Sequence, residues 1–142
     1  MIIIYRQLAA LIVMMTALGL GCATTWADVT DVNSNQVQSL LESEAVVIDI
    51  RREEEWIATG IIETSHTVTF FDKYGSFNAR RWLQQVSPLL ERDKPVVLIC
   101  HAGVRSKWVA AWLTENTDFE PVFHAVQGIQ GWLDQGNVTI AY

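Results

Sequence analysis

The sequence has few of the residues that build metal sites and disulfide frameworks. It contains two cysteines and three histidines in 142 residues, and these are scattered without the close spacing of metal ligands. Basic residues are also few, with 10 lysines and arginines against 16 aspartates and glutamates, for a net charge of −6. An acidic balance argues against nucleic acid or an anionic membrane as a partner. We therefore expect neither a metal ion nor a nucleic acid.

The chain also lacks internal repeats, runs of like charge and low-complexity segments. Half of it is hydrophobic, at 50%, and 18% is charged, which is typical of a globular domain and not of a disordered or fibrous chain. We expect one domain over residues 28–142, which is long enough to bury one small core.

The first 27 residues differ from the rest. Arg6 is their only charged residue, an uncharged and mostly apolar run follows over 8–21, and small residues come next. This order is typical of a secretory signal peptide, and the run is shorter than the roughly 20 residues that cross a bilayer. The sequence predicts a signal peptide over 1–27, cleaved before Asp28, and a periplasmic protein without stable membrane insertion.

Two alternatives stay open for this segment. Cleavage can fall after Ala23, or a lipid on Cys22 or an uncleaved helix can tether the protein to the membrane, facing the periplasm. Cleavage at either site leaves Cys100 as the one cysteine, and a single cysteine in an exported chain indicates a reactive thiol or an intermolecular bridge. The plainer interpretation is a buried cysteine acting as a small hydrophobic residue.

Apolar, β-branched stretches alternate with amphipathic ones along the rest of the chain. Pro88 is expected to kink or split one helix, and residues 135–142 have no predicted place. The alternation predicts an α/β fold with a mainly parallel central sheet and helices on both faces. We expect helix-capping residues at 31–34, strands at 45–50, 67–70, 96–99 and 122–126, and helices at 36–41, 52–58, 77–91, 106–115 and 129–133.

Cys100 directly follows the predicted strand at 96–99 and precedes the predicted helix at 106–115. In open α/β sheets, ligands bind beyond the carboxyl ends of the strands, and Asp49 and Arg51 fall at the end of another strand. Backbone N–H groups and the positive end of the helix dipole converge at such a point. These surroundings favour a thiolate, which is the nucleophilic form of cysteine. We expect Cys100 to be an ionised, accessible nucleophile.

The residues after Cys100 suit an anion. Gly103 permits a positive φ, successive N–H groups can form an anion-binding concavity, and Arg105 offers a planar fork of donors. Ser106 is expected to be the N-cap of the following helix. We predict that the substrate-binding residues are His101, Ala102, Gly103, Val104 and Arg105.

The segment Cys-x-x-Gly-x-Arg-Ser resembles the active-site loop of the rhodanese family, the thiosulfate sulfurtransferases. Three other segments resemble family motifs in the family's order, so the resemblance covers roughly residues 30–133. They are Asp49-Ile50-Arg51 with Glu54-Glu55-Trp56, Gly60-Ile61-Ile62 with Ser65-His66, and the closing segment Val126 to Trp132.

The chain departs from the family pattern at four places. Ile61 stands where the family usually has histidine, Thr64 stands near an expected glycine, and Gln127 replaces the first glycine of the closing pair. One extra residue lies between Trp56 and Gly60. These differences concern packing and turns more than the cysteine loop. The family's substrate preference is nevertheless not transferred to this chain.

The resemblance implies double-displacement catalysis, in which Cys100 takes sulfur from a small sulfur-anion donor and passes it, as a persulfide, to a thiol or cyanide acceptor. It implies no cofactor. Two alternatives remain: a non-catalytic persulfide carrier or binding module, and a cysteine phosphatase or arsenate reductase. Tyrosine-phosphatase loops place five residues between cysteine and arginine, where this chain has four, and a histidine at the position of Ile99.

The plainer interpretations of the remaining polar and aromatic residues are structural. Asp49 and Arg51 are expected to form a supporting ion pair, and His66 and His124 to have non-catalytic roles. Trp108 and Trp112 are expected to cover the sheet, with an apolar rim to the site as the alternative.

Overall fold

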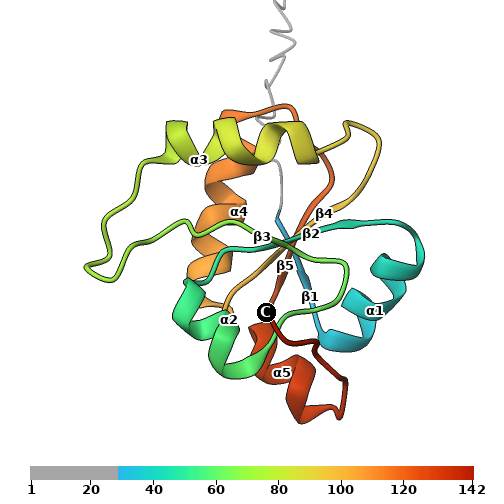
Figure 1. Ribbon diagram of the computed structural model, residues 1–142. Helices are drawn as coiled ribbons and strands as arrows, with labels where there is room; N and C mark the ends of the chain where they lie inside the picture. The colour runs from blue at the N-terminus through green and yellow to red at the C-terminus, as the bar shows by residue number, and fades with distance from the viewer. Residues whose placement is uncertain (1–28) are drawn as a thin grey trace, which may run out of the picture.

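The computed structural model describes residues 29–142, which form one α/β domain (Figure 1). The predicted signal peptide and Cys22 lie outside the described residues. The strands are β1 (Thr30–Val32), β2 (Val46–Asp49), β3 (His66–Thr67), β4 (Val96–Ile99) and β5 (Val122–Ala125). The helices are α1 (Ser34–Glu42), α2 (Glu53–Thr59), α3 (Ala79–Val86) with the 3₁₀ turn η1 (Ser87–Leu89), α4 (Val104–Asn116) and α5 (Gly128–Asp134).

The sheet has the order β1-β5-β4-β2-β3, and all its pairings are parallel. β4 is the central strand, and every residue of it is buried. Because side chains alternate along a strand, Val96 and Leu98 join one apolar cluster while Val97 and Ile99 join the other. This confirms the predicted fold class.

Each apolar cluster packs one pair of helices against the sheet. The first contains Trp82 of α3 and Val109 and Leu113 of α4, and the second contains Val37 of α1 and Ile129 of α5. Figure 1 shows α3 and α4 together on one side of the strands and α1 and α5 on the other. Helices therefore cover both faces, as the apolar strands predict.

The structure adds one strand that the sequence does not predict and corrects three predicted boundaries. β1 was not predicted, and the expected cap residues overlap it; a strand of three residues with two exposed carries no clear periodicity. β3 covers residues 66–67 instead of 67–70, because only these two pair with β2. The long helix begins at Ala79, capped by Asn78, and ends at Val86, and Pro88 lies within the 3₁₀ turn η1 that follows it. α4 begins at Val104, two residues earlier than predicted.

The C-terminal segment, for which the sequence predicts no place, closes one end of the domain. Ile140 forms an antiparallel bridge with Ile61, and the Thr139 hydroxyl donates to the Thr59 carbonyl at 2.8 Å. The Tyr142 ring lies 5.0 Å from that of Trp56, centroid to centroid. These contacts join residues about 80 positions apart, which local patterns do not reveal.

Candidate active site

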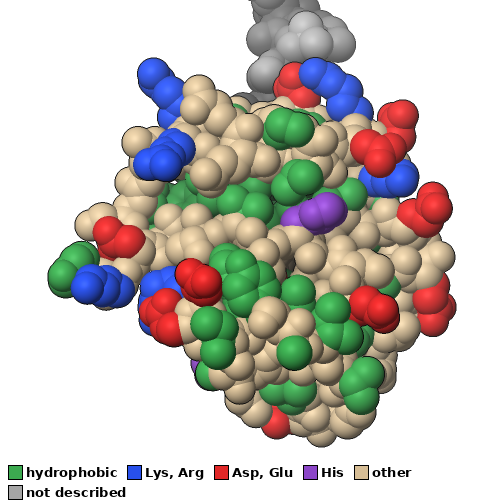
Figure 2. All heavy atoms as spheres, viewed as in Figure 1, with side chains coloured by type: hydrophobic (Ala, Val, Ile, Leu, Met, Phe, Trp, Pro, Cys, Tyr) green, Lys and Arg blue, Asp and Glu red, His purple; other side chains and the backbone are tan. Residues whose placement is uncertain are grey.

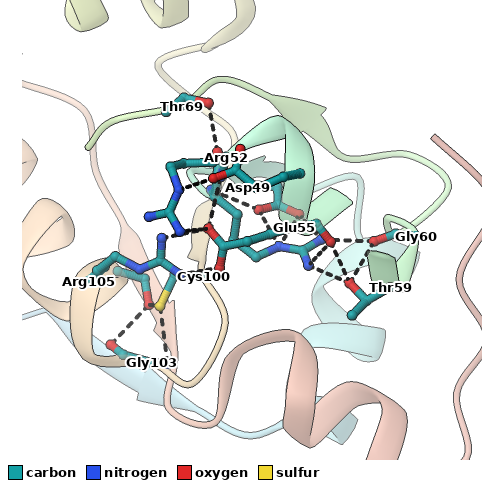
Figure 3. Close-up of polar contacts among 12 residues, drawn as sticks. Asp49, Arg52, Glu55, Thr59, Gly60, Thr69, Cys100, Gly103 and Arg105 are labelled. Carbon is teal, nitrogen blue, oxygen red and sulfur yellow. Dashed lines mark hydrogen bonds and ion pairs between the residues drawn. The ribbon is translucent and has the colours of Figure 1, made fainter. Parts of the chain in front are cut away.

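The cysteine loop connects the central strand to α4 (Figure 3). Cys100 follows β4, and Gly103 is the N-cap of α4 with φ of +89°. This confirms the predicted positive φ. A Cβ atom at residue 103 would overlap the carbonyl group of Val126, which follows β5. Glycine is therefore required both by the turn and by the close approach of two backbones.

The N-terminus of α5 holds the loop in place. Its amides at Ile129 and Gln130 donate to the carbonyl oxygens of Cys100 and His101, at 2.8 and 3.0 Å. Gly128 precedes them with φ of +56°, and a Cβ there would overlap the Cys100 carbonyl. The first turn of a helix has free N–H groups, so α5 binds the carbonyl side of the loop and fixes its orientation.

The sulfur of Cys100 is buried and receives polar contacts. The residue is 1% exposed, which makes the expectation of an accessible sulfur wrong in this conformation. The reason is that Cys100 continues a fully buried strand and joins its apolar cluster. The Gly103 N–H nevertheless donates to Sγ at 3.2 Å, so at least one loop amide points at the sulfur.

Ser106 is not the N-cap of α4. Gly103 takes that position, and Ser106 lies within the first turn of the helix. Its hydroxyl lies 3.1 Å from the Gly103 carbonyl oxygen and 3.4 Å from Cys100 Sγ. The left-handed conformation of Gly103 turns the chain into the helix early, which directs the serine inward toward the sulfur.

The guanidinium of Arg105 is bound to Glu55 of α2. Its two terminal nitrogens donate to the two carboxylate oxygens at 2.9 and 2.6 Å, a geometry that Figure 3 shows beside Cys100. The donor fork predicted for a substrate oxyanion is thus occupied by a protein carboxylate. The sequence pointed to this partner only through the Glu54-Glu55-Trp56 segment, and that segment does not show which glutamate contacts Arg105.

This ion pair stabilises the charged form of both partners. Burial alone would raise the pKa of Glu55, but hydrogen bonds from Arg105 and from the Arg52 backbone lower it from 4.5 to about 2. The hydrogen bond to Glu55 raises the pKa of Arg105. The pair therefore persists across the physiological pH range.

The other predicted substrate-binding residues lie at the surface. His101 and Ala102 are exposed, and Val104 is exposed by 81%. One turn further along α4, Trp108 is 45% exposed and lies 5.0 Å from the ring of Phe77. Trp112 packs against the core, so one of these two tryptophans covers the sheet and the other leaves an apolar surface beside the loop.

Asp49 and Arg51 form a buried structural pair. Arg51 is 0% exposed, and its Nη2 lies 2.7 Å from Asp49 Oδ2. Its guanidinium also donates to the Thr59 hydroxyl at 2.6 Å and to the Gly60 carbonyl at 2.9 Å. Arg51 thereby joins the end of β2 to the end of α2, and this arrangement sets the position of the helix that carries Glu55.

A separate groove of about 800 Å³ lies between the β3 segment and α3. Figure 2 shows apolar side chains at the floor of a hollow below α3. Its walls combine Phe70, Phe77 and Trp82 with Asn78 and Arg81, and no residue from 100 to 106 lines it. The groove is therefore distinct from the cysteine loop.

Residues 29–142 hold neither a cluster of metal ligands nor a membrane-spanning helix. In that part of the chain, no group of three or more His, Cys, Asp or Glu side chains is placed to hold a metal ion. No helix among the same residues has the length and hydropathy needed to span a membrane.

Comparison with known proteins gave consistent matches. Residues 33–135 match the model of the rhodanese-like domain. The chain is 29% identical over 108 residues to a thiosulfate sulfurtransferase GlpE of Actinobacillus pleuropneumoniae, covering 75% of this chain and 89% of that protein.

Solved structures share the fold. A polysulfide-sulfur transferase homodimer of Wolinella succinogenes superposes with a TM-score of 0.63 at 20% identity, over 82% of this chain and 81% of that one. A rhodanese-related protein of Thermoplasma volcanium superposes with a TM-score of 0.62 at 22% identity, over 80% and 99% of the two chains.

Proposed function

Because the chain belongs to the rhodanese-like domain family, we propose that it is a sulfurtransferase that moves sulfane sulfur from thiosulfate, or a similar small anion, to a thiol or cyanide. The observation that supports this most directly is the contact between the Gly103 N–H and Cys100 Sγ at 3.2 Å. A backbone amide aimed at the sulfur stabilises a thiolate or a persulfide anion. The similarity to thiosulfate sulfurtransferases supports the same chemistry.

The proposed reaction has two displacements. The Cys100 thiolate attacks the outer sulfur of thiosulfate, a new S–S bond forms, and sulfite leaves with the electrons of the old S–S bond. An acceptor thiolate or cyanide then attacks the outer sulfur of the persulfide and restores the Cys100 thiolate. No external oxidant or reductant is consumed. Arg105 would bind the donor anion after release from Glu55.

A persulfide carrier without turnover is the second candidate. The burial of Cys100 and the occupation of Arg105 by Glu55 favour it. A donor must displace protein atoms before it reaches the sulfur of Cys100, because the residue is 1% exposed. A protein that protects a bound sulfur from solvent until a partner opens the site would have this geometry.

One experiment tests both candidates. The intact mass of the purified protein is measured before and after thiosulfate, the modified peptide is identified, and thiocyanate is assayed after cyanide is added. A gain of one sulfur on the Cys100 peptide, followed by release as thiocyanate over many turnovers, supports the enzyme. A stable gain without release supports the carrier.

Two variants complete the test. Cys100→Ser is expected to gain no sulfur and to keep the fold, because serine is nearly isosteric but its hydroxyl is not ionised at neutral pH. The matched variant Cys22→Ser should keep both loading and transfer. Sulfur transfer by Cys100→Ser would overturn the assignment.

We also propose that residues 1–27 are an export signal and that the mature protein is periplasmic. The starting mass of the protein purified from an export-competent cell distinguishes cleavage before Asp28, cleavage after Ala23 and a lipid on Cys22. A full-length mass in the periplasmic fraction would contradict cleavage.

A further inference from the structure

Behind the sulfur, four side chains from different elements form a continuous line of polar contacts. Cys100 Sγ lies 3.4 Å from Ser106 Oγ, and Ser106 Oγ lies 3.4 Å from His124 Nδ1. On the other side of the ring, His124 Nε2 lies 3.0 Å from Asp31 Oδ1. The line runs from the residue that follows β4 through α4 and β5 to β1, where the side chain of the aspartate is 52% exposed.

His124 is the buried titratable member of this line. It is 2% exposed, and Nε2 has no aligned hydrogen bond within residues 29–142 despite its short distance to Asp31. Burial lowers the pKa of His124. The Asp31 carboxylate opposes that shift, while the Lys107 ammonium on α4 adds to it.

The charged and titratable groups around the His124 ring come from three parts of the chain. Asp31 faces it from β1, Lys107 of α4 lies 3.6 Å from the same carboxylate, and the Cys100 thiol lies beyond Ser106. Because Asp31 is the nearest anion, it favours a proton on Nε2 of the neutral ring. Nδ1 then carries a lone pair that faces the serine hydroxyl.

The Ser106 hydroxyl has one proton and three neighbouring acceptors. These are the Gly103 carbonyl at 3.1 Å, the Cys100 sulfur at 3.4 Å and His124 Nδ1 at 3.4 Å. A hydroxyl donates only one hydrogen bond at a time. Whether His124 Nδ1 carries a lone pair or a proton therefore affects whether the sulfur receives a second hydrogen bond besides that from the Gly103 amide.

We propose that His124 is a positioning residue for Cys100. It acts through the Ser106 hydroxyl, and its protonated ring increases hydrogen bonding to the sulfur. In the neutral state, Nδ1 accepts the serine proton and the sulfur loses that donor. In the protonated state, Nδ1 donates to Ser106 Oγ and no longer accepts the serine proton. That proton is then shared between the Gly103 carbonyl and the sulfur, of which the thiolate carries the negative charge. The positive ring also lies one hydroxyl away from the negative sulfur, which favours the thiolate further.

The test measures thiol reactivity and does not depend on the proposed sulfur transfer. Alkylation of Cys100 by iodoacetamide is followed between about pH 4 and pH 9, with the Cys100 peptide quantified by mass spectrometry so that Cys22 does not contribute. For an isolated thiol, the logarithm of the rate rises with unit slope below the thiol pKa, because the thiolate reacts. In the wild type, we expect rates below the His124 pKa to exceed that line by about fivefold or more, the lower end of usual coupling between sites.

The variants separate positioning from stability. His124→Gln and Ser106→Ala are expected to follow the straight line, while His66→Gln, at an exposed histidine on β3, should keep the wild-type profile. Asp31→Asn should move the deviation to lower pH, because it removes the anion that favours the protonated ring. This substitution also serves if His124→Gln does not fold. A straight wild-type profile, or a deviation that is unmoved by Asp31→Asn, overturns the proposal.

Discussion

The guanidinium of Arg105 and the carboxylate of Glu55 are paired through two hydrogen bonds, of 2.9 and 2.6 Å, across 50 positions of the chain. The pair joins α2 to the first turn of α4, directly beside the cysteine loop (Figure 3). It places a neutralising carboxylate where an anionic donor would need a free cation. The use of small anions is therefore expected to depend on how easily Glu55 releases Arg105.

Substitutions in this pair should change thiosulfate kinetics in opposite directions. Arg105→Ala removes the cation and leaves Glu55 as an unpaired anion, so kcat/KM for thiosulfate should fall about tenfold or more. Glu55→Gln frees the guanidinium, so KM for thiosulfate should decrease. The double variant separates loss of the cation from exposure of the anion. Unchanged kinetics in Arg105→Ala would remove Arg105 from the site.

Glu55 should also contribute a pH-dependent part of the stability. Its pKa is about 2 in the folded protein, against 4.5 as the ordinary value. Because the folded pKa is the lower one, the contribution is complete above about pH 4.5 and is lost as the pH falls toward about 2. We expect about 1–2 kcal/mol, reduced from the full linkage value because the pair is partly exposed.

The measurement is urea unfolding of the wild type and Glu55→Gln at several pH values in that window. The difference in their free energies of unfolding should shrink as the pH decreases. A difference that stays constant from about pH 5 to pH 2 would contradict the assigned pKa.

Gly103→Ala is expected to disrupt the cysteine loop. A methyl group there would overlap the Val126 carbonyl, at a residue with φ of +89°. Gly75 is a matched control, because its φ is +80° and a Cβ atom would meet no heavy atom within 4 Å. Gly75→Ala should cost about 1–2 kcal/mol for the left-handed backbone alone. Gly103→Ala should cost clearly more and should lower sulfur loading, measured by thermal unfolding and intact mass; equal costs would argue against the close approach.

Asp49→Asn should destabilise the domain without a direct effect on the chemistry. It leaves the fully buried Arg51 without its charge partner, and breaking a buried pair in this way costs about 3–5 kcal/mol. Glu91→Gln, which breaks a partly exposed pair with Lys94 at 3.2 Å, should cost no more than about 1 kcal/mol. Activity per folded molecule should be unchanged in both; a specific loss in Asp49→Asn would give Asp49 a role in the reaction.

The sequence by itself determined the fold class and the position of the cysteine loop. The stretch 95–99 is apolar and β-branched, so it predicted a buried strand with Cys100 just beyond its carboxyl end. Gly103 predicted the positive φ that the structure has. These features depend on local composition and spacing, which a single sequence contains in full.

Tertiary structure alone decided what surrounds the sulfur. The burial of Cys100, the partner of Arg105 and the line from Ser106 through His124 to Asp31 depend on contacts between residues far apart in the chain. Strand β1, which carries Asp31, has three residues and gives no periodic signal. Opposite charges and hydrogen-bonding groups are abundant in any sequence, and only the packing of helices against the sheet selects which of them meet.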